Sequence, residues 1–455
     1  MAFEIINPLT NHKIKEIQEH TEKDIEVAIS LAYKAYDKWR EVSFKQRAEH
    51  MKLAAKLMRS RKNQYAQIMT DEMGKSLREG KSEIDKCALV CEHYAFHAEE
   101  YLAREKLPVD EGEAYIEYNP IGIVLAIMPW NFPFWQVFRF AAPNLMAGNV
   151  GLLKHAANVP QCSLAIEEVL RDAGFPSGTF ASLLIKSDKV KLIIEDERVK
   201  AVTLTGSEAA GSNVASLAGK HIKKTVLELG GSDPFIVLAD ADLEKASEVA
   251  VKSRMINCGQ SCIAAKRFIV EESVAEKFLK KFKEKMSAIK LGDPNDESVD
   301  YGPLAREDLA EKLLEQVKKS VDKGAKVILG GDRPDKKGAF FNPTILTNVK
   351  PGMPAYDEEL FGPVATVFSV KNEEEAVKIA NDSPYGLGGS IWTQDLDRGK
   401  KLASKVASGA VYVNAMMASD VRMPFGGVKN SGYGRELSHL GIREFMNTKT
   451  VWVKD

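Results

Sequence analysis

From residue 121 onward, short apolar runs alternate with helical periodicity, and this alternation constrains the fold more than any other feature. Residues 121–127 (IGIVLAI) precede a helical pattern from about 134 to 146, and further apolar runs occupy 150–154 and 201–205. Strands that alternate with helices in this way form parallel sheets, because each helix carries the chain back to the same end of the sheet. The pattern therefore predicts an α/β fold.

A second alternating region begins near residue 231. It contains apolar runs at 235–238 and 267–270 and a helical pattern from 274 to about 289. A chain of 455 residues exceeds the size at which a single hydrophobic core stops growing, so two domains are expected. The Gly-, Pro- and Asp-rich residues 292–303 predict a surface loop and not a domain linker.

Charge and cysteine content limit the classes of partner. The formal net charge is −1 and the two signs are interspersed, which gives no footprint for nucleic acid or an anionic membrane. The longest apolar stretch, residues 121–130, is about half of what a bilayer requires. Five cysteines in a long chain are typical of a reducing compartment. We expect a cytoplasmic protein whose partners are small molecules or other protein chains.

Residues 257–262 (NCGQSC) carry the clearest chemical signal. They place cysteines beside a glycine, and the segment 228–231 (ELGG) supplies a carboxylate about thirty residues upstream, which can reach the same site only through folding. A cysteine thiolate is a strong nucleophile. The pair therefore predicts thioester chemistry.

These two segments, together with residues 129–133 (PWNFP) and 359–363 (ELFGP), resemble the NAD(P)-dependent aldehyde dehydrogenase superfamily. The four motifs occur in the order typical of the family, and the likeness runs over nearly the whole chain. A shorter bacterial branch, the succinic semialdehyde dehydrogenases, is resembled in particular by residues 154–156, 231–235 and 262–268.

The resemblance implies a domain organisation. It assigns residues 1–100 and 121–230 to a Rossmann-type dinucleotide-binding domain, 231–432 to an α/β catalytic domain, and 101–120 with 445–455 to a small β oligomerisation arm. Such arms pair with a partner subunit, so a homodimer or homotetramer is expected. Polar and apolar residues alternate in the tail, which suits an edge strand.

The resemblance also implies three catalytic roles. Cys262 is the nucleophile that adds to the aldehyde carbon. The Asn131 side-chain amide and the Cys262 backbone amide are neutral donors for the oxyanion that forms. Glu228 is the general base that activates water to hydrolyse the thioester, and its presence favours release of a free acid over transfer to coenzyme A.

No G-x-G-x-x-G motif follows a predicted strand, so cofactor binding rests on residues 205–211 (TGSEAAG) at a strand–helix junction. There Ser207 can cap the helix, and unpaired amides can meet a pyrophosphate. An ordinary capped turn is the alternative interpretation. The resemblance favours a cofactor site for NADP or NAD whose residues are Trp130, Lys154, Gly206, Ser207, Glu359 and Phe361.

Acceptance of NADP is predicted from one position at which this chain departs from the family's pattern. The family often has a glutamate three residues after the lysine that contacts the adenosine ribose, and this chain has Ala157 three residues after Lys154. Without that carboxylate, no like charge repels a 2′-phosphate. His155 and Lys189 are candidate contacts for the phosphate.

The prediction of the substrate depends on Arg139. It lies eight residues after Asn131, about two helical turns on, at an offset that carries a carboxylate-binding arginine in succinic semialdehyde dehydrogenases. A solvated helix arginine is the alternative. Those enzymes often have a second arginine at the position of Ile256, and Arg254 or Arg422 is a candidate replacement.

Three functions follow from these alternatives. The first is oxidation of succinic semialdehyde to succinate. The second is a broad dehydrogenase for uncharged aldehydes in which Arg139 is structural, and the third is a non-catalytic scaffold with the same fold. Trp135 and Phe138 either line the substrate tunnel or belong to the core.

The remaining cysteines receive other interpretations. Cys87, Cys91 and Cys162 lie in apolar helical patterns and are predicted to be buried. Cys87 and Cys91 share a predicted helix with two histidines, but the cysteine pair and the histidine pair project about 120° apart, so no metal is predicted. Cys258, four residues before Cys262, is a possible redox partner for it if the loop bends suitably; the alternative is a thiol that never meets its neighbour.

Overall fold

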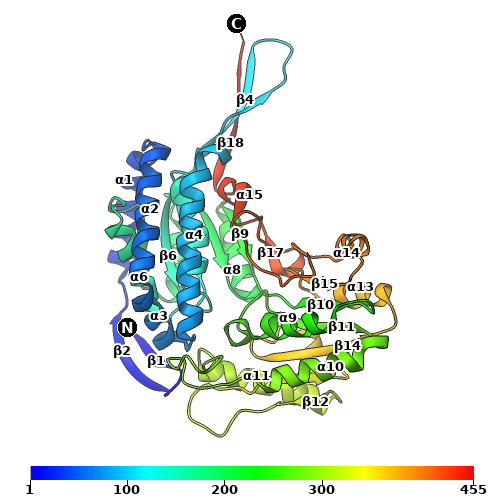
Figure 1. Cartoon of the computed structure of the whole chain (residues 1–455). Coiled ribbons are helices and arrows are strands. Elements are labelled where there is room, and N and C mark those ends of the chain that lie inside the picture. The colour runs from blue at the N-terminus through cyan, green and yellow to red at the C-terminus, as the bar shows by residue number, and fades with distance from the viewer. Residues whose placement is uncertain (1, 455) are drawn as a thin grey trace.

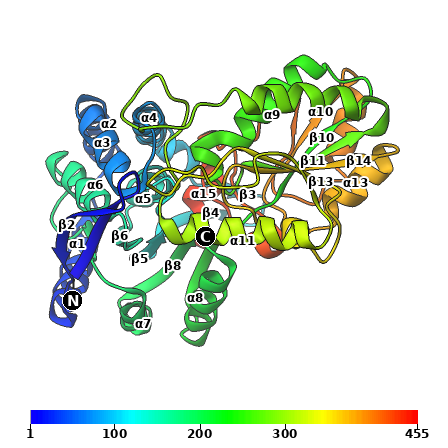
Figure 2. The same ribbon diagram turned by 90° about the horizontal axis from the view of Figure 1, so that it is seen from below.

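The computed structural model describes residues 2–454. Met1 and Asp455, the outermost residues of the predicted first domain and of the predicted arm, lie outside the described residues. Two α/β bodies lie side by side, and a narrow β arm projects from one end of the molecule (Figure 1, Figure 2). The predicted α/β fold with parallel sheets is confirmed.

A six-stranded sheet forms the centre of the first body. Its strands in spatial order are β17 (Gly432–Tyr433), β9 (Lys224–Glu228), β8 (Val199–Thr205), β5 (Ile123–Met128), β6 (Val150–His155) and β7 (Phe180–Ser182). All neighbours are parallel except β17, which pairs antiparallel with β9. The predicted runs 150–154 and 201–205 therefore lie in one sheet, on β6 and β8, which are the two neighbours of β5.

Helices surround this sheet and share its core. They are α1 (Glu22–Trp39), α2 (Phe44–Ser60), α3 (Lys62–Met73), α4 (Leu77–Tyr101), α5 (Trp135–Met146), α6 (Pro160–Asp172), α7 (Val190–Glu195) and α8 (Glu208–Lys220), with a 3₁₀ turn at Ser187–Lys189. Capping boxes begin α1 and α2, where the Thr21 and Ser43 side chains accept hydrogen bonds from the third helical amide. Helix α5 is buried along its whole length, which places its first turn deep inside the body.

The second body contains a seven-stranded sheet. Its strands in spatial order are β12 (Lys326–Leu329), β13 (Thr344–Thr347), β14 (Val364–Val370), β11 (Ala265–Glu271), β10 (Asp233–Val237), β15 (Ser390–Trp392) and β16 (Tyr412–Val413). Only the β12–β13 pair is antiparallel. Parallel strands buried on both faces read as continuous apolar runs, which is how β10 and β11 appear in the sequence.

The helices of this half are α9 (Leu243–Met255), α10 (Glu272–Ser287), α11 (Glu307–Asp322), α12 (Pro354–Asp357), α13 (Glu373–Asn381) and α14 (Leu396–Ala403), with 3₁₀ turns at Ile256–Gly259 and Lys429–Ser431. Helix α15 (Ser438–Arg443) packs against α4 and α5 of the first body. Helix α10 begins and ends two residues before the predicted bounds. Residues 292–303 form a loop apart from one bridge between Leu291 and Tyr301.

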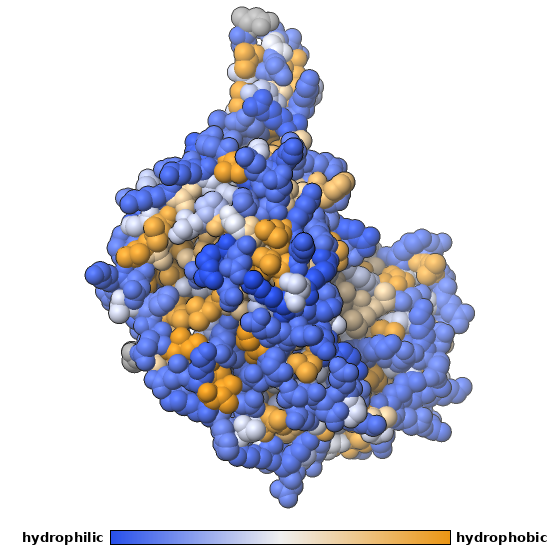
Figure 3. All heavy atoms as spheres, turned by 60° about the vertical axis from the view of Figure 1, so that its left-hand side comes forward, coloured by the Kyte–Doolittle hydropathy of each residue, from blue (hydrophilic) through white to orange (hydrophobic). Residues whose placement is uncertain are grey.

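The arm is a three-stranded antiparallel sheet in the order β18 (Met446–Val453), β4 (Glu113–Pro120), β3 (Glu105–Leu107). Strand β18 pairs with β4 along its full length and has no partner on its other side among residues 2–454. A separate hairpin joins β1 (Ala2–Asn7) to β2 (His12–Gln18). Figure 3 shows the arm standing clear of a body surface on which hydrophobic residues are scattered among hydrophilic ones.

The carboxyl ends of the parallel strands position the candidate residues. Strand β5 ends just before residues 129–134, β8 just before 206–207, and β9 ends at Glu228. In open parallel sheets ligands bind at this edge. Among residues 2–454, none of the helices is long and apolar enough to cross a membrane.

Candidate active site

Two cavities meet at Cys262. The α4–α5 cavity has a volume of about 240 Å³ and is lined by Glu79, Ser82, Glu83, Lys86, Phe132, Trp135, Gln136, Arg139, Ile256, Ser261, Cys262, Ile263, Ser419 and Phe425. The β8–α8 cavity has a volume of about 450 Å³, and its lining includes Trp130, Asn131, Gly206, Ser207, Glu359 and Phe361. Cys262 and Gln136 line both. The arrangement places the sulfur where two small molecules can approach it from different sides.

The loop that carries Cys262 has an unusual backbone. Asn257, Cys258 and Gly259 have φ angles of 52°, 53° and 76°, three consecutive residues in the left-handed region. Side chains rarely adopt that region, and a Cβ at Gly259 would lie 2.3 Å from the Gly362 carbonyl oxygen, so only glycine fits there. Backbone strain of this kind persists only where surrounding contacts enforce it.

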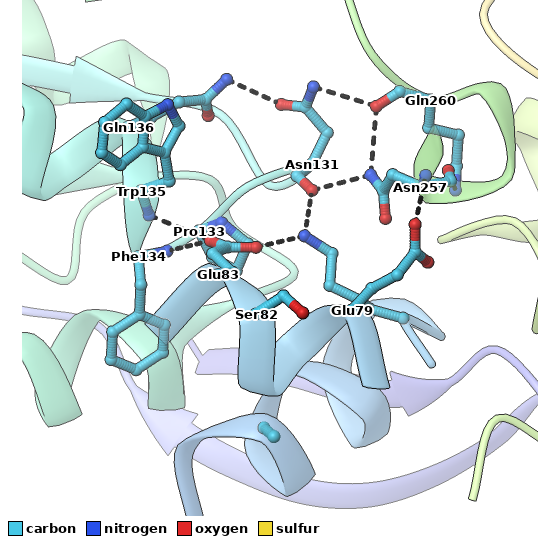
Figure 4. A network of polar contacts seen from close by, with 12 residues as sticks. Glu79, Ser82, Glu83, Asn131, Pro133, Phe134, Trp135, Gln136, Asn257 and Gln260 are labelled. Carbon is cyan, nitrogen blue, oxygen red and sulfur yellow. Dashed lines mark hydrogen bonds and ion pairs between the residues drawn. The ribbon is translucent and has the colours of Figure 1, made fainter. Parts of the chain in front are cut away.

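Hydrogen bonds from both bodies hold this turn. The Asn257 backbone amide donates to Glu79 Oε1 at 2.7 Å, and its side-chain amide donates to the Asn131 carbonyl at 2.8 Å and to the Gln260 carbonyl at 3.1 Å (Figure 4). The Gln260 side-chain oxygen in turn accepts from the Ala305 amide at 2.9 Å. The turn before Cys262 is therefore held from both bodies.

Asn131 is oriented by hydrogen bonds on each of its polar atoms. Its Nδ2 donates to the Gln260 carbonyl at 3.1 Å, and its Oδ1 accepts from Gln136 Nε2 at 3.0 Å (Figure 4). The Nδ2 group has two hydrogens and only one is used by this contact. The second hydrogen is available to an oxygen atom bound next to Cys262.

A buried ion pair also holds the backbone at Asn131. Lys75 Nζ pairs with Glu83 and donates to the Asn131 carbonyl at 2.8 Å. Glu83 Oε1 also accepts from the Phe134 and Trp135 amides, each at 2.9 Å, at the N-terminus of α5 (Figure 4). A carboxylate at this position satisfies amides that no helical carbonyl can reach, and it complements the helix dipole.

The Cys262 thiol is weakly acidic in this environment. Burial raises its pKa to about 12, while the positive charges of Arg139 and Lys266 oppose the increase. At neutral pH the group is therefore a thiol and not a thiolate. A cation bound nearby would lower the pKa and generate the nucleophile.

Glu228 is buried at the end of β9, and neither of its carboxylate oxygens has a hydrogen-bond partner among residues 2–454. Burial raises its pKa well above the usual value, and the nearby Glu436 raises it further, whereas Arg139 lowers it. Glu228 is absent from the lining of both cavities. Gly426 packs against it, and a Cβ there would lie 2.6 Å from Glu228 Oε1, so glycine provides the space that this carboxylate occupies.

The N-terminus of α8 opens into the β8–α8 cavity. Ser207 caps the helix by accepting from the Ala210 amide at 3.3 Å, as its position before the helical pattern predicts. On the opposite strand ends, Glu359 Oε1 lies 3.1 Å from Lys266 Nζ and accepts from the Gly231 amide at 3.2 Å. Amides at a helix N-terminus bind anions such as a pyrophosphate.

Two aromatic side chains stand in the same cavity. The Trp130 and Phe361 rings meet edge to face, with centroids 5.8 Å apart and planes at 88°. Lys154 is the penultimate residue of β6, and burial lowers its pKa. It does not appear in the cavity lining.

The two residues expected to contact a 2′-phosphate are engaged elsewhere. His155 Nδ1 accepts from the Ala156 amide at 2.8 Å and Nε2 lies 2.9 Å from the Pro133 carbonyl, and burial lowers its pKa to about 4. Lys189 pairs with Glu19 at 2.9 Å and donates to the His20 carbonyl at 2.8 Å. His155 is uncharged at neutral pH and Lys189 has its counter-ion, so neither presents an uncompensated positive charge to a 2′-phosphate.

Arg139 lines the α4–α5 cavity but is not a solvated helix arginine. Its guanidinium pairs with Glu436, donates to Thr205 Oγ1 at 3.2 Å and lies 4.6 Å from the centroid of the Phe425 ring. The side chain is almost fully buried. Its positive charge is thus largely compensated within the protein.

The other candidate arginines do not reach the cavity. Arg254 is fully buried and donates to the Gly259 carbonyl at 2.6 Å, which supports the Cys262 loop. Arg422 pairs with Asp420 at 2.7 Å on the surface. Trp135 lines the cavity, whereas Phe138 is fully buried in the hydrophobic core of the first body, so for Phe138 the structure favours the core interpretation.

Sequence reasoning missed several residues of this site. Gln136 orients Asn131, Glu436 neutralises Arg139, and Lys86 contributes a further positive charge to the α4–α5 cavity. Gln136 follows the PWNFP motif closely enough to be suspected. The other two lie in segments whose pattern is that of an ordinary amphipathic helix and an ordinary loop, which carries no signal.

Cys258 and Cys262 are both free thiols, and Cys87, Cys91 and Cys162 are buried as predicted. Cys258 packs in the core of the second body, whereas Cys262 packs against the core of the first. A disulfide between them requires the loop to rearrange. Residues 2–454 contain no group of three or more His, Cys, Asp or Glu side chains suited to a metal ion.

Comparison with known proteins identifies relatives over the whole chain. The family model described as the aldehyde dehydrogenase family matches residues 1–451. A probable succinate-semialdehyde dehydrogenase [NADP(+)] of Synechocystis sp. is 51% identical over 453 residues, and succinate-semialdehyde dehydrogenase [NADP(+)] 1 of Mycobacterium tuberculosis is 48% identical over 458; in both cases all of each chain is covered.

Solved structures agree with this match. The crystal structure of succinic semialdehyde dehydrogenase from Streptococcus pyogenes in complex with NADP+ superposes with a TM-score of 0.98 at 38% identity and full coverage of both chains. A betaine aldehyde dehydrogenase structure from Staphylococcus aureus in complex with NAD+ gives 0.96 at 30% identity, covering all of this chain and 92% of its own.

The raised pKa of the Cys262 thiol leads to a test by alkylation. In the protein alone, iodoacetamide should label Cys262 slowly at pH 7, and the rate should rise about tenfold per pH unit up to about pH 11, because the thiolate is the reactive form. Peptide mass spectrometry reports the site, and free N-acetylcysteine, whose rate levels off near pH 9, is the reference. A labelling rate that also levels off near pH 9 would show that burial does not raise this pKa.

Proposed function

The chain belongs to the aldehyde dehydrogenase family, and on that premise we propose that it oxidises succinic semialdehyde to succinate through a thioester on Cys262. The observation that carries the substrate assignment is the α4–α5 cavity, which adjoins the sulfur and is lined by two buried or half-buried cationic side chains, Lys86 and Arg139. Positive charge in the wall of a small cavity favours an aldehyde that bears a carboxylate. Relatives that are 48–51% identical over their full length carry the corresponding name.

The chain's own residues perform three steps. The Cys262 thiolate adds to the aldehyde carbon, and the resulting oxyanion accepts hydrogen bonds from the free Nδ2 hydrogen of Asn131 and from the Cys262 backbone amide. After the carbon has been oxidised to the thioester, Glu228 removes a proton from water, whose oxygen attacks the acyl carbon. The carbon–sulfur bond then breaks, which releases the acid and regenerates the thiolate.

The cofactor in this proposal is NADP+, with NAD+ as an alternative acceptor, and when bound it supplies the acceptor for the hydride that leaves the tetrahedral carbon. The β8–α8 cavity suits such a molecule in volume, in its helix N-terminus and in its aromatic walls. Gly206, Ser207, Trp130, Glu359 and Phe361 line it and would hold the pyrophosphate, the nicotinamide and its ribose; Lys154 would contact the adenosine ribose.

NADP+ is favoured over NAD+ by the residue three positions after Lys154. Ala157 is exposed at this point and presents no carboxylate to repel a 2′-phosphate. The printed names of the Synechocystis and Mycobacterium relatives specify NADP(+).

The same proposal extends to cellular setting and assembly. Free thiols at all five cysteines support a reducing cytoplasm. The unpaired edge of β18 on a projecting arm supports a homodimer or homotetramer, because an exposed strand edge offers a row of hydrogen-bonding groups to a second chain.

A broad dehydrogenase for uncharged aldehydes is the second candidate. Phe132, Trp135, Ile263 and Phe425 give the α4–α5 cavity extensive apolar walls, which would bind an alkyl chain without a charge. The two candidates differ in the preference between a charged and an uncharged aldehyde of equal length.

That preference is the first test of the proposed function. With NADP+, initial rates of NADPH formation should give a kcat/KM for succinic semialdehyde more than about tenfold above that for butanal, equivalent to about 1.4 kcal/mol of discrimination. The same assay with NAD+ measures the cofactor ratio. Equal kcat/KM values for the two aldehydes would favour the broad dehydrogenase, and a complete lack of turnover with NADP+ would contradict the cofactor assignment.

Glu228→Gln tests the hydrolytic step. In stopped flow this variant should form about one equivalent of NADPH per active site in a rapid burst and then turn over at least about 10²-fold more slowly than wild type, because the thioester forms but water is not activated. In wild type the steady-state rate should rise with pH, since the raised pKa keeps Glu228 protonated on the acid side. Cys262→Ser should show neither burst nor turnover. Wild-type turnover in Glu228→Gln would exclude this residue as the base.

A further inference from the structure

A buried lysine holds the segment that carries Cys262 from its C-terminal side. Lys266, the second residue of β11, is only 1% exposed. Its Nζ donates to the Ser261 carbonyl at 2.9 Å, to the Cys262 carbonyl at 2.9 Å and to the Ala264 carbonyl at 3.2 Å. One ammonium group therefore gathers the backbone oxygens on both sides of the proposed nucleophile.

The charges around Lys266 keep it in the ammonium form. Glu359 Oε1 lies 3.1 Å from Nζ and is its counter-ion. Burial lowers the pKa of Lys266, Glu359 raises it, Arg254 on α9 lowers it, and Asp233 on β10 and Cys262 raise it. All the groups that contact Nζ are hydrogen-bond acceptors, which suits an ammonium, a donor through each of its hydrogens.

The bond to Ser261 determines where the Cys262 amide points. The Ser261 carbonyl and the Cys262 N–H belong to one planar peptide unit, and because this unit is trans the two groups point in opposite directions. With the carbonyl fixed toward Lys266, the N–H is directed away from it. Among residues 2–454 this N–H donates to no other group, so it is free for an oxygen bound next to the sulfur.

The same contacts make the amide a stronger donor. A positive charge at the carbonyl end of a peptide unit polarises the unit, and hydrogen bonds arranged in a chain reinforce one another. The bond from Lys266 to the Cys262 carbonyl also fixes the next peptide unit along the chain. The directions of the Cys262 amide and of its side chain are thus set by one group.

We propose that Lys266 is a positioning residue for the oxyanion: by binding the Ser261 and Cys262 carbonyls, it aims and strengthens the Cys262 amide that stabilises the developing charge. The inference rests on the proposed function, in which the Cys262 sulfur adds to a carbonyl carbon. Lys266 lines neither cavity and acts only through the backbone. It complements Asn257, which holds the same loop from its N-terminal side.

Two thiol reagents separate this role from the effect of charge on the thiol. Burial raises the pKa of Cys262, and the positive charges of Arg139 and Lys266 oppose the increase, so losing Lys266 lowers the thiolate fraction. Iodoacetamide and p-nitrophenyl acetate both react with the thiolate. Only the ester passes through an oxyanion: the sulfur adds to the ester carbon, and the bond to p-nitrophenolate then breaks. The ratio of the two rates, each corrected with Cys262→Ser, therefore reports the oxyanion contribution.

In Lys266→Met the ratio of ester acylation to alkylation should fall at least about tenfold, because an oxyanion donor is misdirected. Lys266→Arg retains the positive charge and should recover part of the ratio. Thr366→Val is the matched control, since Thr366 Oγ1 donates to the Lys266 carbonyl at 2.9 Å and not to Nζ. An unchanged ratio in Lys266→Met, or an equal fall in Thr366→Val, would overturn the inference.

The acylated protein gives a spectroscopic readout. In a Glu228→Gln background, which slows hydrolysis, an ester labelled with a carbon isotope lets infrared difference spectra isolate the thioester carbonyl stretch. Hydrogen bonds to that oxygen lower its frequency. Adding Lys266→Met should raise the frequency, as should Asn131→Ala, which removes the other proposed donor. A frequency that responds to Asn131→Ala but not to Lys266→Met would contradict the role of Lys266.

Lys266→Met leaves Glu359 without its cation, so the double variant Lys266→Met/Glu359→Gln is compared with Glu359→Gln in parallel. Neither reagent needs a cofactor, and the same fall in the ratio is expected between these two variants. Neither reagent is an aldehyde. A wild type that oxidises no aldehyde but shows the Lys266 effect would overturn the proposed function and uphold the inference. Aldehyde oxidation by wild type with an unchanged ratio in the Lys266 variants would do the reverse.

Discussion

The buried ion pair between Lys75 and Glu83 is the interaction on which the rest of the site depends. Lys75 fixes the Asn131 carbonyl, and Glu83 fixes the first amides of α5, so one pair of charges positions both the loop after β5 and the helix that follows it. A buried charge left without its partner costs about 3–5 kcal/mol. Both groups are therefore retained only together, and α5, which carries Gln136 and Arg139 into the cavities, is held at a fixed depth.

The Asn131 carbonyl connects this part of the first body to the second body. It accepts from the Asn257 side chain, and Asn257 begins the left-handed turn that presents Cys262. The Asn131 side chain meanwhile donates to the Gln260 carbonyl of the same turn. The proposed nucleophile and the proposed oxyanion donor thus come from different bodies, and the segments that carry them share hydrogen bonds. The distance between them therefore depends on the packing of the two bodies and not on the flexibility of either loop.

The sequence was sufficient for elements whose signal is local. Apolar runs predicted β6 and β8, and a capping serine predicted the start of α8. Among the residues that the motifs singled out, Trp130, Asn131, Gly206, Ser207, Glu359 and Phe361 line one cavity with Cys262, whereas Glu228 and Lys154 do not. The direction in which each side chain points within an element was harder to predict. Lys154 and His155 are successive residues of one strand and therefore point to opposite faces, which buries His155 when Lys154 is at the accessible face.

Helix α5 shows the same difficulty in predicting side-chain orientation, here with a period of 3.6 residues. Trp135, Gln136 and Arg139 fall within about 100° of one another around the helix and line the α4–α5 cavity, whereas Phe138 lies outside that arc and enters the core. Partners from distant segments left no signal at all. Glu436 lies 297 positions after Arg139, and Lys86 comes from a helix whose sequence is that of any amphipathic helix.

The pairing of Arg139 with Glu436 has a consequence for the proposed general base, Glu228. An arginine directed at Glu228 without a second carboxylate would lower the pKa of that residue and make it a weaker base. Glu436 takes up this positive charge and adds a negative one, so Glu228 keeps a raised pKa inside a site that also contains two cations. Because Glu436 compensates Arg139, the site can contain both a positive charge in its wall and a carboxyl group with a raised pKa, which is what the proposed general base requires.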